Sequence, residues 1–305
     1  MEQMQVSIII VNYNTKDFLK NCLDSIYKHT TDIKYEIIVS DNGSTDGSLE
    51  MLSADYPKVR VVANGKNLGF GAANNRALDV AKGKYIFYLN SDTLLLNNAV
   101  KLFYDYFEAH ENEKLGAIGA NLLDETNCVI HSSGTFAGFA LSFKQLFKML
   151  ISNLILSFMY IFHISTSRFA HSDKTKFFTG EVDYITGADL FLLNNEAARF
   201  DENFFLYFEE ADLQRRLALQ EKNRLLIEGP QIQHLCGGSV GSDFSIKRKA
   251  SFSRIQFELS RVRFLKKYNH NNLALFSIKI LISIIWINPF LIKSTKKFLK
   301  QLWRI

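Results

Sequence analysis

Acidic side chains follow two apolar segments in the first third of the sequence, at the point where each segment ends. Asp41 comes directly after residues 35–40, and Asp92 comes three residues after 85–89. In an open α/β sheet, ligands bind outside the carboxyl ends of the strands, so both carboxylates are expected at a binding site. Asp92 could instead cap a helix over 94–107, because Asp is a preferred N-cap residue. Two acidic strand ends together favour a site.

Three further acids, Glu209, Glu210 and Asp212, follow the aromatic run 204–208. A hydroxyl that attacks an electrophile needs a base, and a carboxylate in a partly apolar pocket can have its pKa raised towards neutral pH. The residues therefore predict a general base at this place. A solvated helix start is the alternative explanation.

A loop of small residues, 67–75, runs into a segment that includes Arg76. Backbone amides at a helix start, together with a guanidinium, suit a phosphate group. Close packing of a helix on a sheet also uses glycine and alanine, and this stretch alone does not separate the two explanations. Residues 237–242 resemble a loop that could close on a ligand.

The elements that must position these residues alternate in type. The pattern predicts strands at 6–11, 35–40, 59–62 and 85–89, separated by helices at 18–26, 48–54 and 71–81. This alternation is typical of right-handed crossovers and a mostly parallel sheet, so residues 5–120 are expected to bind a nucleotide.

Composition limits the class of protein. With 305 residues and 47% hydrophobic content, the chain can bury one large core, or a core plus an appendage. Cys22, Cys128 and Cys236 form no disulfide or zinc pattern, which predicts a reducing, cytoplasmic setting. Residues 1–5 lack a basic segment, so a secretory signal is not expected.

Charge is divided unevenly along the chain. Fourteen Lys and Arg and one acid lie from Lys247 onwards, a charge of +13, so a total of +5 leaves −8 for residues 1–246. Lysines interleave with the apolar stretch 274–292, which favours the anionic surface of the inner membrane over nucleic acid. This stretch could also span a bilayer, although Lys279 and Pro289 favour an interfacial position or insertion as a hairpin.

A second apolar stretch, 141–164, interrupts the middle of the chain. Its most apolar part, 149–162, has fourteen residues, fewer than the ~20 needed to cross a bilayer. Lys144 and Lys148 precede that part, so an interfacial helix pair and a buried core helix are equally good explanations.

Four motifs occur together in an informative order: residues 6–14, 41–47, 67–71 and 89–93. This arrangement resembles the family-two inverting glycosyltransferases with the GT-A fold, and among them the bacterial rhamnosyltransferase-type enzymes of surface polysaccharide synthesis. The resemblance covers roughly 5–240.

The resemblance implies a fold and a domain organisation. It implies an α/β GT-A domain over 1–245, with a Rossmann-like, mostly parallel sheet flanked by helices. Residues 5–120 would be the nucleotide-sugar-binding half and 121–245 the acceptor half, with the insertion 141–164 in the latter. The resemblance does not cover the insertion or the basic, apolar tail 246–305, which is expected from its own composition to form helices that associate with the membrane.

The resemblance also implies roles on the donor side. Asp41 would hold the nucleobase, and Asp92 would be the last acid of a DxD-type motif that binds a metal bridging two phosphates. The first acid of that motif is Asn90 here, which leaves fewer charged ligands. The other donor-binding residues implied are Val11, Asn12, Tyr13, Asn67, Gly69, Arg76, Ser91, Gly187 and Ala188.

On the acceptor side, Glu210 takes the position of the base, with Glu209 as its close competitor. Where the family usually has Glu-Asp, the base here is one methylene longer. Asp212 is expected to orient its neighbours or cap the helix. His234 would join the metal or contact the diphosphate, and a histidine beside a carboxylate favours Mn²⁺ somewhat, with Mg²⁺ as the other candidate.

The function that follows is transfer of a sugar, with inversion, to a hydroxyl of a lipid-linked glycan at the cytoplasmic face of the membrane. The donor would be dTDP-rhamnose or a UDP-hexose, and the product a cell-surface polysaccharide. One alternative is a sugar-nucleotide nucleotidyltransferase, although residues 12–14 are not the glycine-rich turn that such an enzyme needs. Another is a non-catalytic membrane scaffold with a degenerate donor pocket.

Overall fold

The computed structural model describes residues 3–110, 113–161, 176–235, 252–286 and 292–305. The chain divides into two compact units. The first, here called the α/β unit, comprises Met1–Phe136, Lys174–Phe205 and Glu209–Gly241. The second, called the helical unit, comprises Ala137–Asp173, Leu206–Phe208 and Ser242–Ile305.

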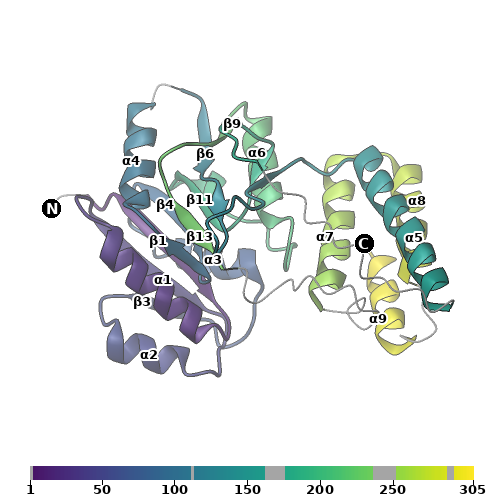
Figure 1. Cartoon of the computed structure of the whole chain (residues 1–305), viewed down its shortest axis with the longest axis horizontal. Helices are drawn as coiled ribbons and strands as arrows, with labels where there is room; N and C mark the ends of the chain where they lie inside the picture. Colours follow the sequence, from purple (N-terminus) through teal and green to yellow (C-terminus); the bar gives the residue numbers. More distant parts are fainter. Residues whose placement is uncertain (1–2, 111–112, 162–175, 236–251, 287–291) are drawn as a thin grey trace. The chain divides into compact units, whose positions relative to one another are not determined.

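An eight-stranded sheet forms the centre of the α/β unit (Figure 1), in the order β3-β2-β1-β4-β11-β6-β12-β9. β11 and β9 run antiparallel to their neighbours and the other six strands share one direction, so the predicted mostly parallel sheet is confirmed. The strands are β1 (Val6–Asn12), β2 (Tyr35–Asp41), β3 (Arg60–Ala63), β4 (Tyr85–Asn90), β6 (Leu115–Gly119), β9 (Gly180–Glu181), β11 (Asp189–Leu193) and β12 (Asn223–Leu226).

Helices cover both faces of this sheet, because its central strands are apolar on both sides. Ile8 and Ile10 pack on one face with α1, α2 and α4, whereas Ile9 packs on the other with α3 and α6. The alternation follows the two-residue period of a strand. The helices are α1 (Lys16–His29), α2 (Ser48–Asp55), α3 (Phe70–Leu78), α4 (Ala99–Ala109) and α6 (Glu209–Leu219).

A small sheet corrects one prediction. Thr93–Leu95 is not the start of a helix but strand β5, and α4 begins only at Ala99. β5 pairs with β13 (Ile232–His234), which also pairs with β7 (Leu122–Leu123). A partner so distant in sequence decides the local structure here, and Asp92 does not cap a helix. A further two-stranded ladder joins β8 (Ser133–Gly134) to β10 (Tyr184–Ile185).

The helical unit has its own apolar core. Its helices are α5 (Phe139–Ile161), α7 (Phe252–Tyr268), α8 (Asn272–Trp286) and α9 (Ile292–Leu302), and Leu146, Leu259, Ile278 and Phe298 are among the residues that they bury. The described part of the insertion, within α5, therefore packs with the C-terminal helices. Among the described residues, we find no helix whose length and apolar character would suffice to cross a membrane.

Candidate active site

Polar residues stand in register at the ends of β2, β1 and β4. In the parallel ladders Asn12 pairs with Asp41, and Val11 pairs with Asn90. Asp92 follows β4 by two residues. The prediction that two acidic strand ends meet at one edge of the sheet is therefore confirmed.

Asp41 differs from its prediction in one respect, because its carboxylate is fully buried rather than projecting. Oδ2 accepts a hydrogen bond from the Asn12 side chain at 2.8 Å, and Oδ1 accepts from the backbone N–H groups of Gly43 and Ser44 at 3.0 and 2.9 Å. Its oxygens thus hold the turn after β2 against β1. Asp41 organises this edge from beneath.

The next residues along β1 are more accessible. Val11 is half-buried, whereas the Tyr13 side chain is 47% exposed. An exposed aromatic ring at a sheet edge offers a face on which a nucleobase can stack. Asn14 adopts φ of 54°, a left-handed conformation in which its side chain accepts from the backbone N–H of Thr45 at 2.8 Å.

The backbone of Asn90 and Ser91 is fixed on two sides. The Asn90 N–H donates to the carbonyl of Ala188 at 3.0 Å, which ties β4 to the predicted donor residues before β11. The Ser91 hydroxyl, in a largely buried side chain, lies 3.0 Å from the hydroxyl of Thr15. The chain leading to Asp92 is therefore held rigidly.

Asp92 and His234 lie side by side because of the β5–β13 ladder. His234 pairs with Thr93, and the Leu235 N–H donates to the Asp92 carbonyl at 2.9 Å. His234 Nε2 is 3.2 Å from Asp92 Oδ1, and the two side chains are 20% and 19% exposed. Residues 142 positions apart in sequence thus present one nitrogen and one oxygen donor together.

This pair fits part of a divalent-cation site. Both side chains are partly exposed, and a carboxylate oxygen with an imidazole nitrogen suits Mn²⁺. Within the described ranges, no group of three or more His, Cys, Asp or Glu comes together to hold a metal. A cation bound here would therefore take most of its ligands from substrate phosphates and water, as Mg²⁺ often does.

The loop before α3 packs tightly against a distant segment. A side chain at Gly69, where φ is +89°, would place its Cβ 2.3 Å from the carbonyl oxygen of Phe205. That carbonyl accepts from the Phe70 N–H at 3.0 Å, and the exposed Asn67 accepts from the Gly69 N–H at 2.9 Å. Glycine at 69 is thus required by close approach. The predicted phosphate ligand Arg76 is exposed in the last turn of α3, about 9 Å along the axis from Phe70.

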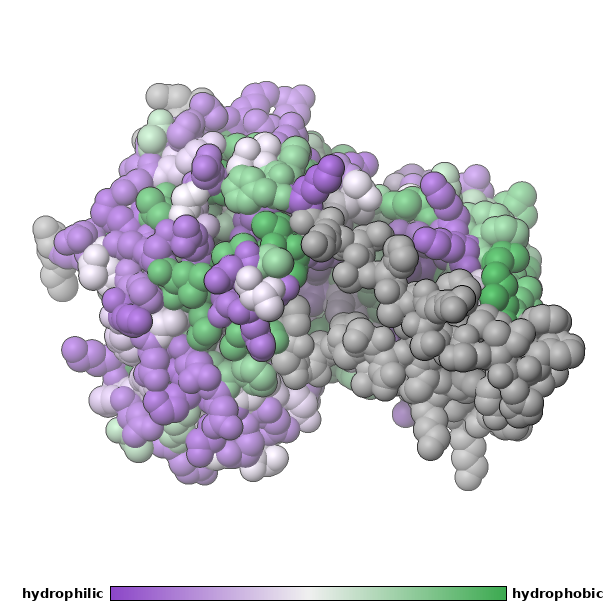
Figure 2. Space-filling model, viewed as in Figure 1, coloured by the Kyte–Doolittle hydropathy of each residue, from purple (hydrophilic) through white to green (hydrophobic). Residues whose placement is uncertain are grey.

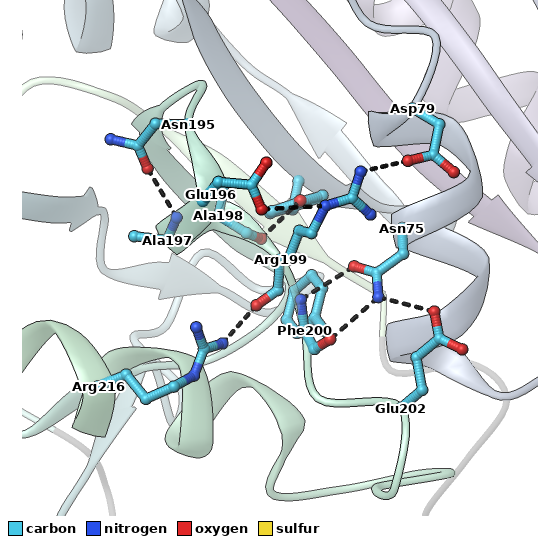
Figure 3. Close-up of polar contacts among 11 residues, drawn as sticks. Asn75, Asp79, Asn195, Glu196, Ala197, Ala198, Arg199, Phe200, Glu202 and Arg216 are labelled. Atoms are coloured by element: carbon cyan, nitrogen blue, oxygen red, sulfur yellow. Dashed lines mark hydrogen bonds and ion pairs between the residues drawn. The ribbon is translucent and has the colours of Figure 1, made fainter.

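Asn75 attaches the segment before the acidic cluster to α3 (Figure 3). Its buried amide donates to the Phe200 carbonyl at 3.0 Å and accepts from the Phe200 N–H at 2.9 Å. It also donates to Glu202 at 3.0 Å. The side chain thus pairs with a backbone as a neighbouring strand would.

Ion pairs hold the same region from the other side (Figure 3). The short 3-10 helix η1 (Glu196–Ala198) precedes Arg199, whose guanidinium pairs with Asp79 of α3. Arg216 of α6 donates to the Arg199 carbonyl, and Asp212 lies 3.2 Å from Arg216 Nε. The prediction that Asp212 orients its neighbours is confirmed.

The two glutamates of the cluster differ in access. Glu209 is 3% exposed, and its Cβ lies 3.6 Å from the position that a Cβ on Gly71 would occupy. Glu210 is half-buried, and its Cβ lies 3.7 Å from the corresponding position at Gly187. Both glutamates thus lie beside a glycine, and Glu210 is the more exposed of the two.

Burial changes the acidity of Glu210. Desolvation raises its pKa from 4.5 to about 6, against hydrogen bonds from backbone N–H groups at the start of α6 that lower it. A carboxylate with this pKa is ionised at neutral pH and is a stronger base than an exposed glutamate. The site therefore combines a carboxyl of raised pKa with the polar ends of β1, β2 and β4.

A second carboxyl, Asp189, is buried two residues after Gly187. It accepts from the Ala120 N–H at 2.6 Å, and burial raises its pKa well above the ordinary value. The Asp189 carboxyl is therefore used inside the sheet, where it binds a backbone N–H group and does not meet solvent.

Two amide side chains were missed by the sequence analysis, Asn75 and Gln214. Gln214 pairs with both backbone groups of Ile185 at 2.8 Å and donates to the Glu210 carbonyl at 3.2 Å. Both amides occupy buried positions on helices, and buried polar groups are almost always hydrogen-bonded, which was the available signal. The predicted loop 237–242 lies outside the described residues.

The sequence itself matches a known family at this site. The family description Glycosyl transferase family 2 matches residues 7–150, which include both strand ends and the loop before α3. Residues 7–150 are a glycosyl transferase family 2 domain. Asn12, Asp41, Asn90 and Asp92 lie within this domain, whereas Glu210 and His234 lie beyond it.

Curated relatives of the family 2 domain include a glucosyltransferase and a synthase. The chain is 33% identical over 159 residues to poly(ribitol-phosphate) beta-glucosyltransferase of Bacillus spizizenii, covering 48% of this chain and 25% of the relative. It is 26% identical over 231 residues to hyaluronan synthase of Pasteurella multocida, covering 73% of this chain and 22% of the relative. The chain thus spans about a quarter of the length of these relatives.

Solved structures show the same fold. The crystal structure of GalNAc-T7 with UDP, GalNAc and Mn²⁺ matches with a TM-score of 0.61 at 15% identity, over 99% of this chain and 55% of that one. A mannosyltransferase from Pyrobaculum calidifontis with GDP-Man and Mn²⁺ matches with a TM-score of 0.52 at 13% identity, over 100% and 74%. The α/β fold of this chain is therefore GT-A-like.

Proposed function

We propose that this protein transfers a glycosyl group from a nucleotide sugar to a hydroxyl of a glycan acceptor, with inversion at the anomeric carbon. One observation carries the proposal: Glu210, with its pKa raised to about 6, lies beside Gly187, and the carbonyl of the next residue, Ala188, binds the β4 end that leads to Asp92. A base and a donor edge are thus joined through one short segment.

The reaction is a single displacement. The Glu210 carboxylate accepts the proton of the acceptor hydroxyl as its oxygen bonds to the anomeric carbon. The bond from that carbon to the phosphate oxygen breaks on the opposite side, and the nucleoside diphosphate leaves with the electron pair. Attack opposite the leaving group inverts the configuration, and Glu210 then releases its proton to solvent.

Asp92 and His234 would hold a divalent cation, which would neutralise charge on the departing diphosphate. Asp41 and Asn12 shape the donor edge from beneath, and the exposed Tyr13 ring offers a stacking face for the base. The amides at the start of α3 remain a candidate phosphate contact.

The donor is dTDP-rhamnose or a UDP-hexose, and the acceptor a lipid-linked glycan at the cytoplasmic face of a membrane. The motif order supports the first choice, and the names of the relatives, a poly(ribitol-phosphate) beta-glucosyltransferase and a hyaluronan synthase, support a polymeric product. A lipid-linked acceptor also suits the basic, apolar helices of the second unit.

The test is release of nucleoside diphosphate from a panel of dTDP-, UDP- and GDP-sugars, with Mn²⁺ or Mg²⁺ and a glycolipid extract. Glu210→Gln is expected to lower the rate by roughly 10²- to 10⁴-fold. Glu221→Gln is the matched control, because Glu221 follows the far end of α6 in an exposed pair with Lys114. Turnover of one donor supports transfer and names the sugar.

Three outcomes would contradict the proposal. Equal rates for the wild type and Glu210→Gln would show that Glu210 is not the base. No release from any donor by folded protein would favour a non-catalytic scaffold. Formation of a nucleoside triphosphate and a sugar 1-phosphate when pyrophosphate is added would favour a nucleotidyltransferase.

A further inference from the structure

Two helices of the helical unit carry apolar side chains on their solvent side. On α5 these are Phe143, Phe147, Ile151, Leu154 and Ile155, between 41% and 59% exposed. Their spacing of three to four residues places them on one stripe of the helix. A soluble helix normally has polar residues on that side.

α8 repeats this arrangement. Leu273, Phe276, Ile280 and Ile284 follow at steps of three and four residues and are between 39% and 76% exposed. The two helices pack against each other, although they are more than 100 residues apart in sequence. Figure 2 shows apolar side chains gathered over the part of this unit where α5 and α8 lie.

These stripes are additional to the core of the unit. α5 buries Leu146 on a different face, and α8 buries Leu275, Ile278 and Ile282. Each helix therefore has one apolar face that is used and a second that meets solvent. Apolar patches of this kind usually mark an interaction surface.

The charge of the unit indicates what that surface meets. Its sequence holds seventeen Lys and Arg against three Asp and Glu, a net charge of +14, whereas the α/β unit carries −9. Lys296, Lys297, Lys300 and Arg304 are exposed on or just after α9. Juxtaposed lysines and apolar side chains suit anionic lipid, since each Lys near such a surface contributes about 1 kcal/mol.

An aromatic cluster joins the apolar stripe to the charges. Trp303 is 45% exposed, lies edge-on to Phe276 with 5.6 Å between ring centroids, and has Lys279 Nζ 5.7 Å from its ring. Tryptophan prefers the boundary between lipid headgroups and acyl chains, where its ring is buried and its N–H can still donate a hydrogen bond. Here the indole N–H donates to Ser283 at 3.2 Å.

We propose that the exposed stripes of α5 and α8, together with Trp303 and the lysines of α9, form one lipid-binding surface that lies on an anionic bilayer. It requires two segments that the sequence separates, the insertion and the tail. This inference deepens the proposed function by naming the surface that would bring the site to a lipid-linked acceptor. Binding itself needs neither donor nor cation, so the two proposals can fail separately.

A second copy of the chain is the competing occupant. Two helical units of +14 would repel each other across such a contact, whereas an anionic surface attracts both the charges and the apolar stripes. An anionic bilayer is therefore the better partner for this surface.

The test is sedimentation of the full-length protein with vesicles of phosphatidylcholine, alone or with an equal part of phosphatidylglycerol. Binding is expected only to the mixed vesicles and is expected to weaken with salt. Lys296→Glu/Lys297→Glu should weaken it at least about tenfold. Lys28→Glu/Lys58→Glu, which makes the same change of charge at exposed positions of the α/β unit, should leave it nearly unchanged.

The apolar part has its own matched pair. Leu273→Ser/Phe276→Ser should weaken binding by at least about tenfold, whereas Leu193→Ser/Leu219→Ser, at exposed positions of the α/β unit, should not. In Trp286→Phe, Trp303 is the one remaining tryptophan, and its fluorescence should shift to the blue with mixed vesicles.

Three results would overturn the proposal. Equal binding to both vesicle types would show that the lysines do not contribute to binding. An unshifted Trp303 spectrum in protein that sediments with vesicles would show that Trp303 does not enter the bilayer. A dimer in solution that Leu273→Ser/Phe276→Ser dissociates, without vesicle binding by the wild type, would assign the stripes to a second copy.

Discussion

The two units place their polar and apolar residues in opposite ways. In the α/β unit the apolar side chains of the central strands are closed inside two helix layers, and acids and amides gather where β1, β2 and β4 end. In the helical unit, apolar stripes remain at the surface beside lysines and arginines. One unit thus offers a polar edge to a small molecule, and the other an apolar, basic face to an extended surface.

The contrast shows that the role of an exposed aromatic side chain depends on the residues around it. Tyr13 and Phe276 are 47% and 50% exposed, yet Tyr13 follows Asn12 at a strand end, whereas Phe276 belongs to a stripe beside Trp303. The same fraction of exposed aromatic surface fits a nucleobase in one place and lipid in the other. If this comparison is right, changes in one unit should leave the activity of the other intact.

The largest effect is expected from the donor edge. Asp92→Ala should lower metal-dependent transfer on the order of 100-fold or more, because a charge-stabilising ligand of the leaving diphosphate is lost. Vesicle binding should not change. Asp105→Ala, in an exposed pair with Lys101 on α4, is the control and should change neither transfer nor vesicle binding. A parallel loss of vesicle binding in Asp92→Ala would break the comparison.

Stability of the α/β unit should depend on one glycine. Gly69→Ala combines a positive φ with a Cβ 2.3 Å from a backbone oxygen, so it should lower the free energy of unfolding by about 3 kcal/mol or more. Gly65→Ala shares a positive φ but meets nothing within 4 Å, and should cost only about 1 kcal/mol. Urea unfolding measures both, and equal costs would show that the Phe205 contact does not matter.

In the helical unit, neighbouring leucines should separate core from surface. Leu275→Ala removes a side chain that is 7% exposed and should cost about 2 to 3 kcal/mol in unfolding free energy. Leu273→Ala, at 76% exposure, should cost less than about 0.5 kcal/mol. A large cost at Leu273 would mean that its stripe is part of the fold rather than free for lipid.

The smallest effect concerns the stability cost of the base. The pKa of Glu210 is raised in the folded protein, so ionisation at high pH is easier in the unfolded chain. Stability is thus lost as pH rises from about 4.5 through about 6, and none is lost below that range. Glu210→Gln should therefore gain about 1 to 2 kcal/mol at pH 8, and nothing near pH 4. Urea unfolding at the two pH values measures this, and a loss of stability at pH 8 would contradict the burial argument.

Much of the donor edge could be predicted, because it depends on local patterns. The apolar runs before Asp41 and Asp92 define strands, and parallel strands align their carboxyl ends. The predictions that were wrong or missing concern segments whose structure depends on strands that are distant in sequence. Thr93–Leu95 is a strand only because β13 pairs with it, and β11 enters the sheet antiparallel, which no local period signals.

The acceptor side was less accessible to sequence reasoning. The acids at 209, 210 and 212 were visible as a cluster, but the greater burial of Glu209 than of Glu210 follows only from the packing of the folded chain. The helical unit likewise joins the insertion to the tail. Each stretch was recognised as apolar, yet their shared surface follows only from packing.

The pH dependence of kcat/KM for the acceptor, at saturating donor and cation, tests the central claim that Glu210 is the base, because this ratio reports the pKa of the group before the acceptor binds. The wild type should rise with an apparent pKa of about 6 and level off above about pH 7.5. Glu210→Gln should keep only a slow rate without this rise, while Glu221→Gln should follow the wild type. A rise near pH 6 that persists in Glu210→Gln would assign the proton to another group and contradict the account.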